Sequence, residues 1–278
     1  MRKLTIGICT YDDYNGVYFT IQAIRMYHPE ILDNVEFVII NNNPKSADGI
    51  AIENFTTNWI EEPVQYIEFK DYTSTALRNK IFEYSRTPYV LSMDSHVFIV
   101  PGALKKLIEF YDNNLDDNNL LQGPLLYDDL KCISTHFKLE WRDNMWGTWE
   151  TDPRGENIFN SPFEIEAQGL GLFSCRKIAW LGFNSSFRGF GGEEGYIHTK
   201  YKKNGKCTLC LPFLRWMHRF NRPNGVPYQP KLTDRIRNYL IGFTELGLDT
   251  KEMFEHFNGK VPTATIEALK KELCVSEH

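Results

Sequence analysis

An acid and an imidazole stand two residues apart at the end of a hydrophobic segment of the sequence. Residues 89–93 are mostly apolar, and Asp94, Ser95 and His96 follow them directly. Residues i and i+2 of an extended segment point to the same side, so Asp94 and His96 can reach one point in space. A carboxylate and a neutral imidazole there suit a divalent cation that holds a diphosphate. The sequence therefore predicts a metal site where this segment ends.

An arginine stands shortly before the same segment. Arg78 lies in a helical pattern at residues 73–84, with apolar residues on one face of the predicted helix. A guanidinium at this place can contact a diphosphate through paired hydrogen bonds. A surface salt bridge is the other interpretation of Arg78, and the sequence leaves both open.

A glycine-rich turn at residues 188–192 leads directly into two carboxylates, Glu193 and Glu194. So many glycines cost chain entropy unless the backbone passes close to another group. Acidic residues also favour the start of a helix through their charge alone, and a helix is predicted at residues 193–204. Because the turn precedes them, we expect a functional role for at least one of the two glutamates.

Polar residues also follow the first two predicted strands. A polar turn with an aromatic residue at the end of residues 4–10 can cradle a pyrimidine and a ribose. A second polar turn follows residues 35–41. The candidate nucleotide contacts are Thr10, Tyr11, Asp12, Asn41, Asp71, Arg78, Asp94 and Ser95.

These groups need a sheet whose strands end together. Four short aliphatic segments are typical of strands, at residues 4–10, 35–41, 64–69 and 89–93. Helical patterns at residues 17–27 and 73–84 alternate with them, and a further helix is predicted to begin near residue 101. This alternation predicts an α/β fold, with a mostly parallel central sheet covered by helices on both faces. Ligands bind such sheets at the carboxyl ends of the strands.

The second half of the chain is less regular. Residues 128–162 are rich in tryptophan and turn residues and predict long loops with short strands. Later segments predict helices at 174–181 and 193–204, a strand at 207–213, a loop at 221–229, and helices at 232–246 and 263–275. We expect a catalytic domain at 1–230, with a nucleotide-binding half at 1–100 and an acceptor and sugar half at 101–230. A helical extension follows at 231–278.

Composition limits the function. The chain has 278 residues, 42% hydrophobic and 24% charged, with a net charge of -5. This charge argues against bulk attraction to nucleic acid. No apolar run approaches the roughly 20 residues that span a bilayer. Residues 1–6 enter a strand with no signal-peptide pattern, and the six cysteines are scattered, so we expect a cytoplasmic protein with reduced thiols.

The order of these motifs resembles the GT-A class of glycosyltransferases over residues 4–229. Asp94-Ser95-His96 is similar to the D-x-H motif of polypeptide N-acetylgalactosaminyltransferases, and residues 190–194 resemble their W-G-G-E-N motif. Phe190 and Glu194 replace the tryptophan and asparagine, and we expect no lectin domain. The chain also resembles family-2-like bacterial or phage glycosyltransferases, which are small stand-alone catalytic units.

The resemblance implies a nucleotide-sugar donor, with UDP as the expected nucleotide, and Mn²⁺ or Mg²⁺ as the cofactor. It adds His218 as a third metal ligand beside Asp94 and His96, and a mobile lid at residues 219–229. Glu193 would hydrogen-bond sugar hydroxyls, and Arg78 would contact the diphosphate. Together with Glu194 these two residues form the expected catalytic set.

We expect transfer to a hydroxyl acceptor, with retention favoured over inversion. If Glu194 lies behind the anomeric carbon, it acts as a general base and the enzyme inverts. The acceptor stays open between a glycan, a protein, a small molecule and a modified nucleic-acid base. Two other functions stay open: a nucleotidyltransferase, and a non-catalytic protein that binds a carbohydrate or nucleotide sugar. The residues after the first strand lack the glycine-rich phosphate loop of a nucleotidyltransferase.

Overall fold

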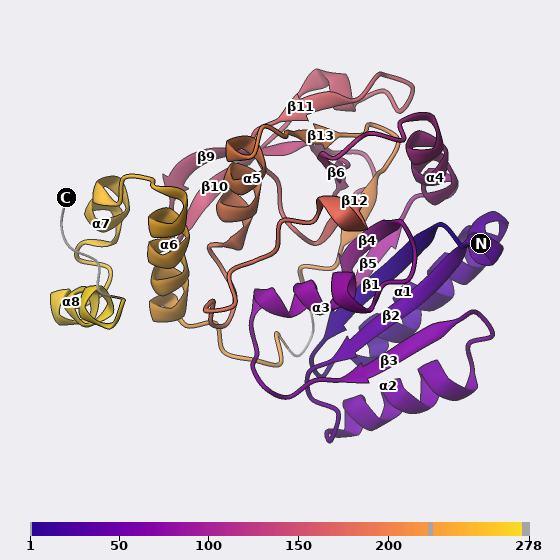
Figure 1. The fold of residues 1–278 in the computed structure, drawn as a ribbon, viewed down its shortest axis with the longest axis horizontal. Coiled ribbons are helices and arrows are strands. Elements are labelled where there is room, and N and C mark those ends of the chain that lie inside the picture. Colours follow the sequence, from indigo (N-terminus) through magenta and orange to yellow (C-terminus); the bar gives the residue numbers. More distant parts are fainter. Residues whose placement is uncertain (1, 222–224, 274–278) are drawn as a thin grey trace.

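The computed structural model describes residues 2–221 and 225–273 and has a mixed eight-stranded sheet at its centre (Figure 1). The strand order is β11-β13-β6-β12-β4-β1-β2-β3. Four of these strands run parallel, as the alternating sequence pattern predicts: β1 (Leu4–Thr10), β2 (Val35–Asn41), β3 (Val64–Glu68) and β4 (Tyr89–Asp94).

The other half of the sheet comes from later in the chain. Its strands are β6 (Leu120–Gln122), β11 (Phe163–Ile165), β12 (Leu172–Arg176) and β13 (Thr208–Cys210). Strand β12 runs antiparallel between β4 and β6, whereas β13 pairs with β6 in parallel. Strand β11 is antiparallel to β13 at the edge.

The helix predicted at residues 174–181 is wrong. This segment holds most of β12 and the short 3-10 helix η4 (Lys177–Ala179). Leu172 packs into one hydrophobic core cluster, while Phe173 and Cys175 pack into another on the opposite side of the sheet. A strand that buries apolar residues on both faces shows no alternation of apolar and polar residues, so periodicity cannot distinguish it from a short buried helix.

Helices cover both faces of the sheet. The core cluster on one face receives side chains from α1 (Tyr14–Tyr27), α2 (Ala47–Asn58) and α4 (Ala103–Asn113), and the 3-10 helix η1 (Pro29–Asn34) joins it through Ile31. The opposite face packs against η2 (Thr75–Leu77), α3 (Arg78–Tyr84) and α5 (Glu193–Lys203). This arrangement confirms the predicted α/β class with helices on both faces.

A second, four-stranded sheet lies next to the end of β4. Its order is β5-β14-β7-β8, formed by β5 (Val97–Ile99), β14 (Trp216–His218), β7 (Leu125–Leu126) and β8 (Ile133–Ser134). Strand β14 is antiparallel to β5, and His218 is the register partner of Val97. Because Val97 follows His96, this pairing brings together two histidines that are 122 residues apart in sequence.

The C-terminal helices pack against a β-hairpin. The hairpin consists of β9 (His136–Arg142) and β10 (Met145–Glu150), and the 3-10 helix η3 (Pro153–Gly155) follows it. Trp141 and Trp146 of the hairpin pack against a hydrophobic cluster that is built largely from α6 (Leu232–Leu246), α7 (Lys251–Phe257) and α8 (Thr263–Glu272). Figure 1 shows these helices at the end of the molecule opposite α1 and α2.

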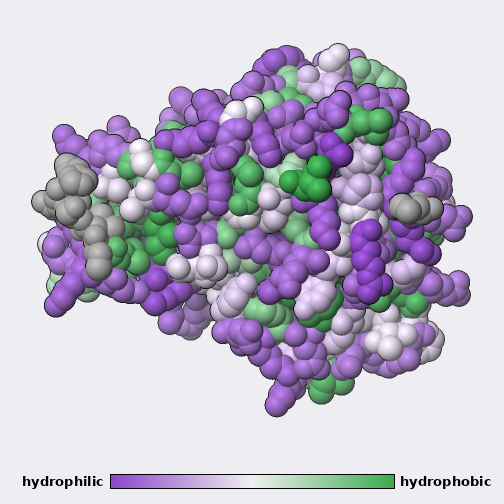
Figure 2. All heavy atoms as spheres, in the orientation of Figure 1, coloured by the Kyte–Doolittle hydropathy of each residue, from purple (hydrophilic) through white to green (hydrophobic). Residues whose placement is uncertain are grey.

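The surface is mainly polar on the face drawn in Figure 2, where apolar residues form small separate groups. Within residues 2–221 and 225–273, no helix is both long enough and apolar enough to cross a membrane.

Candidate active site

A cavity of about 460 Å³ opens at the carboxyl ends of β1 and β4. Its walls come from these strand ends, from η2 and the start of α3, from the first turn of α5, from the β9–β10 hairpin and from β14. Ligands bind open α/β sheets at this edge. The cavity therefore lies where the sequence predicts the site.

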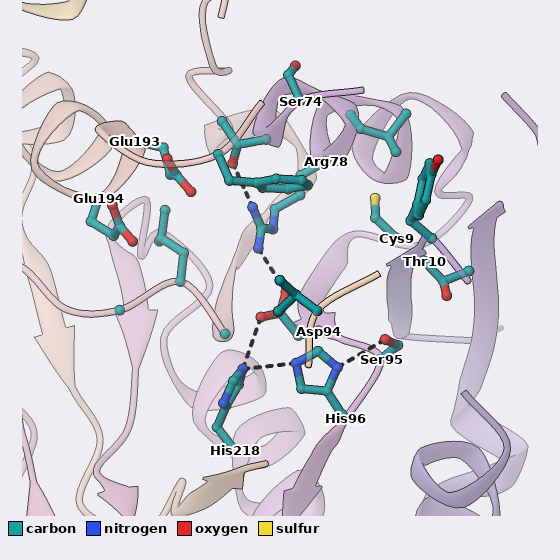
Figure 3. Close-up of a pocket in the computed structure, with 18 of the residues that line it drawn as sticks. Cys9, Thr10, Ser74, Arg78, Asp94, Ser95, His96, Glu193, Glu194 and His218 are labelled. Carbon is teal, nitrogen blue, oxygen red and sulfur yellow. Dashed lines mark hydrogen bonds and ion pairs between the residues drawn. The ribbon is translucent and has the colours of Figure 1, made fainter. Parts of the chain in front are cut away.

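Three metal-competent side chains converge in this cavity. The Nε2 atoms of His96 and His218 are 3.0 Å apart, and His218 Nε2 is 3.4 Å from Asp94 Oδ2. One ligand atom from each residue lies within 4.8 Å of the other two. Figure 3 shows the three side chains pointing toward one another from the end of β4, the β4–β5 connection and β14. Among the described residues this is the one such group of three or more His, Cys, Asp or Glu side chains.

The geometry of this trio fits a divalent cation. Neighbouring ligands of an octahedral ion at about 2.1 Å are about 3 Å apart, which matches the distance between the two Nε2 atoms of His96 and His218. Two imidazoles and one carboxylate suit a transition ion such as Mn²⁺ better than Mg²⁺, which prefers oxygen ligands alone.

Asp13 fixes the orientation of His96. Its Oδ2 lies 2.9 Å from His96 Nδ1 and accepts a hydrogen bond of 2.7 Å from the Ser95 hydroxyl. Its Oδ1 accepts the Gly16 N–H at 3.2 Å, so the same carboxylate caps α1. A Cβ at Gly16 would lie 2.3 Å from Asp13 Oδ2, which explains the glycine at that position. A carboxylate behind a metal-ligating histidine orients the ring.

Arg78 is buried beside Asp94. Its Nη2 lies 2.8 Å from Asp94 Oδ1, and its Nη1 donates to Thr75 Oγ1 at 2.6 Å. Burial by itself would raise the pKa of Asp94, but the charge of Arg78, helped by His218 and His96, holds that pKa well below its usual range. Asp94 is therefore ionised, as a metal ligand would have to be, and Arg78 stands directly beside it.

The glycine turn presents both glutamates to the cavity. Gly191 and Gly192 have φ values of 107° and 90°, which only glycine adopts readily. Glu193 Oε2 accepts the Gly191 N–H at 2.6 Å and holds the turn closed. Burial, followed by the charge of Glu193, raises the pKa of Glu194 to about 8. Glu194 is thus mainly protonated at neutral pH.

His198 ties α5 to Gln122 at the end of β6. Its Nδ1 faces the Glu194 carbonyl oxygen, and its Nε2 lies 2.8 Å from Gln122 Oε1. Gln122 donates in turn to the Gly169 carbonyl oxygen at 2.9 Å. Burial lowers the pKa of His198 to about 4 and keeps the ring neutral. The sequence offers no signal for this role, because it depends on the packing of α5 against β6.

Most of the predicted site residues line the cavity. The hydroxyl of Thr10 is buried and has no hydrogen-bond partner among the described residues, so a ligand can supply one. The predicted residues in the cavity wall are Thr10, Tyr11, Arg78, Asp94, Ser95, His96, Glu193, Glu194 and His218.

Three predicted nucleotide contacts are not among the lining residues. The buried Asn41 amide donates to the Gly49 carbonyl oxygen and to the Tyr66 hydroxyl. The Asp12 carboxylate accepts hydrogen bonds from the side chain of Asn43. Asp71 is exposed. These polar residues at strand ends therefore serve local structure.

The cavity also contains residues that the sequence prediction missed. Asp13 and Asn42 are sequence neighbours of predicted contacts, and a broader reading of the two strand-end turns could have found them. Trp149 and Arg235 come from the β9–β10 hairpin and from α6, and their place follows only from the tertiary structure.

Solved structures resemble this fold despite low sequence identity. GalNAc-T7, solved with UDP, GalNAc and Mn²⁺, aligns with a TM-score of 0.67 and 12% identity over 92% of this chain and 54% of its own. A mannosyltransferase from Pyrobaculum calidifontis, solved with GDP-Man and Mn²⁺, gives 0.59 and 10% over 88% and 64%. The first 349 residues of S. aureus TarS, with UDP-GlcNAc, give 0.55 and 13% over 91% and 70%.

The chain thus spans little more than half the length of GalNAc-T7. No curated protein matches it significantly. The structural likeness confirms the GT-A fold class. A sequence profile of glycosyl transferase family 2 matches residues 5–156, which is more than half of the chain. The protein therefore belongs to glycosyl transferase family 2.

Proposed function

We propose that this glycosyltransferase moves a sugar from a UDP-sugar to a hydroxyl group in a reaction that requires Mn²⁺. The observation that carries the proposal is the convergence of Asp94, His96 and His218 beside the buried Arg78 in one cavity. Structural neighbours that contain UDP or GDP-Man together with Mn²⁺ support a nucleotide-diphosphate donor and the ion, and GalNAc-T7 supports UDP in particular. Mg²⁺ would favour a site made of oxygen ligands alone, and the described residues contain no such group of three or more carboxylates.

Asp94, His96 and His218 would hold the ion, which when bound supplies Lewis-acid stabilisation of the diphosphate that departs. Arg78 would give its guanidinium donors to the same diphosphate. Asp94 and Thr75 already hold the Arg78 guanidinium in position, so the side chain needs little reorganisation when the diphosphate binds.

The nucleoside would lie against the ends of β1 and β2. Thr10 has a buried hydroxyl that is available for a ligand, and Tyr11 offers an aromatic face beside it. Figure 3 draws Thr10 on one side of Asp94, and Glu193 and Glu194 on the other. The sugar and the acceptor would then lie on the side of the glutamates, where Glu193 can bind sugar hydroxyls.

We propose retention of the anomeric configuration. The D-x-H motif, the G-G-E turn and the late histidine support this route, in which the departing phosphate accepts the acceptor proton. Glu194 supports it further, because a carboxyl with a pKa of about 8 is a donor rather than a base at pH 7. Above pH 8 the Glu194 carboxyl would be mainly ionised and could act as a general base. Inversion is therefore the second candidate.

Nuclear magnetic resonance of the product anomer separates the two routes. We expect the donor and the product to share their anomeric configuration, and an inverted product would contradict retention. Binding has a separate test by calorimetry with UDP and MnCl₂. We expect UDP to bind in the presence of Mn²⁺ and to bind weakly without it. The absence of UDP binding under both conditions would contradict the proposed donor.

A further inference from the structure

The cavity continues past the proposed donor site to a wall that no nucleotide contact uses. This wall consists of side chains from the β9–β10 hairpin, the glycine turn, the first turn of α5 and α6. They are Phe137, Met145, Trp149, Phe190, Glu194 and Arg235. We call this region the hairpin–α6 wall. Figure 3 shows Glu194 of this wall on the other side of Asp94 from Thr10, as expected for the place from which an acceptor approaches.

Trp149 forms a rigid aromatic surface in this wall. A Cβ at Gly169 would lie 2.9 Å from the indole Cζ2, so the ring packs directly on the backbone at that glycine. The ring of Phe137 meets it edge to face, with centroids 4.3 Å apart and planes at 71°. Both rings line the cavity, and Trp149 is only partly buried. An indole fixed in this way offers an apolar surface at little entropic cost.

Arg235 is fixed in the same wall by α6. Its Nη1 donates to the Asn144 carbonyl oxygen at 3.1 Å. A Cβ at Gly191 would lie 2.1 Å from Arg235 Nε, so the arginine lies across the glycine turn. Asn238, on the same helix, donates to the Gly191 carbonyl oxygen at 3.0 Å. Helix α6 therefore supplies a guanidinium to the cavity and also holds the turn that carries the glutamates.

The charges of the wall favour a neutral acceptor. Arg235 faces Glu193 and Glu194, and its charge lowers the pKa of both against the effect of burial. One guanidinium against two carboxyl groups leaves no excess positive charge for a polyanion, and the whole chain carries a net charge of -5. Hydroxyl groups both donate and accept, so they match a guanidinium and a carboxyl group together.

We propose that the hairpin–α6 wall is the acceptor subsite and that it binds a neutral glycoside. The apolar C–H face of a pyranose would lie on Trp149, and its hydroxyls would meet Arg235 and Glu194. The inference rests on the proposed function. In the transfer step the acceptor oxygen bonds to the anomeric carbon as the bond to the diphosphate breaks. The hydroxyl proton passes to the departing diphosphate, so atoms and charge balance.

The test uses the full-length protein with MnCl₂ and the UDP-hexose that most stabilises it in a thermal-shift screen. The acceptor probes are methyl α- and β-pyranosides of glucose, galactose and mannose, with a threonine peptide as the competing class. We expect transfer to at least one methyl pyranoside. Trp149→Ala should raise the KM for that glycoside about 3- to 10-fold, and Arg235→Gln about 10-fold or more.

Three variants act as controls. Arg142→Gln changes an exposed arginine of the same hairpin, and Trp59→Ala removes a tryptophan that is 67% exposed. Both should keep the wild-type KM for the glycoside. Trp149→Phe should recover part of the loss caused by Trp149→Ala. Calorimetry with UDP and Mn²⁺ should give the wild-type affinity for each variant, which shows that the donor site is folded.

Three results would overturn the acceptor subsite. One is donor hydrolysis with no transfer to any methyl pyranoside, the second is preferred transfer to the peptide, and the third is a KM that Trp149→Ala and Arg235→Gln both leave unchanged. When UDP and Mn²⁺ still bind in the same experiment, each of these results contradicts the acceptor subsite and leaves the proposed function standing. If the wild type binds no UDP with Mn²⁺, the proposed function fails and the acceptor subsite fails with it.

Discussion

Asp13 Oδ2 lies 2.9 Å from His96 Nδ1, on the side of the imidazole away from the Nε2 that faces His218. An ionised carboxylate only accepts, so His96 Nδ1 carries the hydrogen and the Nε2 lone pair stays available. This hydrogen bond holds the ring in the orientation that a metal ligand would need. Sequence proximity could not reveal this pair, because the two residues are 83 positions apart.

Asp13→Asn tests this orientation. Asparagine keeps an acceptor for the N-terminus of α1, so the fold should persist, but the negative charge behind His96 is lost. We expect the affinity for Mn²⁺ in the presence of UDP to fall about 10- to 100-fold, as measured by calorimetry.

Asp48→Asn is the matched control for this change. Asp48 Oδ2 accepts the backbone N–H of Tyr14 at 3.0 Å, so it also serves the start of α1. This variant should bind Mn²⁺ like the wild type. Equal Mn²⁺ affinities for Asp13→Asn and the wild type would contradict the orienting role.

Arg78→Gln tests the diphosphate contact. The variant removes a buried cation that is held by Asp94 and Thr75, and with it charge-assisted hydrogen bonds to the donor. At saturating Mn²⁺ we expect the affinity for UDP to fall about 10- to 100-fold in calorimetry. Lys80→Gln changes a cation on the same helix that pairs with Glu83 and should leave this affinity unchanged. If both variants weaken binding equally, net charge rather than a direct contact explains the result.

Glu194→Gln should change how stability depends on pH. The pKa of Glu194 is raised from 4.5 to about 8 by burial and by the charge of Glu193, so the folded state keeps a proton that the unfolded state loses. Between these two pH values the wild type therefore loses stability as pH rises. The variant has no such titration. The Tm of Glu194→Gln minus the Tm of the wild type should therefore increase from pH 5 to pH 8.

Thermal unfolding followed by circular dichroism across this pH range checks the effect. Glu252→Gln, which changes an exposed carboxylate on α7, should give a Tm difference from the wild type that does not vary with pH. A constant Tm difference between Glu194→Gln and the wild type would show that the carboxyl group is not protonated when folded.

The sequence predicted the parallel half of the fold well because local patterns govern it. Each of β1, β2 and β4 is an aliphatic run that ends in polar residues. Helix α6 was predicted with its observed bounds because one face is apolar and Gly247 ends it. Helix α2 was missed, because its buried stripe includes Gly49 and Thr56 and therefore gives only a weak apolar pattern in the sequence.

The residues of the candidate site also fall into two groups: those that local sequence patterns predict and those that only the tertiary structure brings together. Asp94 and His96 are visible in sequence, since both follow one strand at alternate positions. His218 was predicted only from motif order, and the β5–β14 pairing is what brings it to His96. Trp149 and Arg235 required the tertiary structure, because each reaches the cavity from an element whose packing no local pattern specifies, whereas Asp13 belongs to the first strand-end turn.

Pulsed electron paramagnetic resonance of the complex with Mn²⁺ and UDP tests the central claim most directly, because it detects nitrogen atoms bound to the ion. We predict nitrogen couplings from two imidazoles in the wild type. His96→Gln and His218→Gln should each remove one of them, while His136→Gln, which changes a histidine outside the site, should remove neither. Mn²⁺ that is bound with UDP but shows no histidine nitrogen coupling would contradict the site formed by Asp94, His96 and His218.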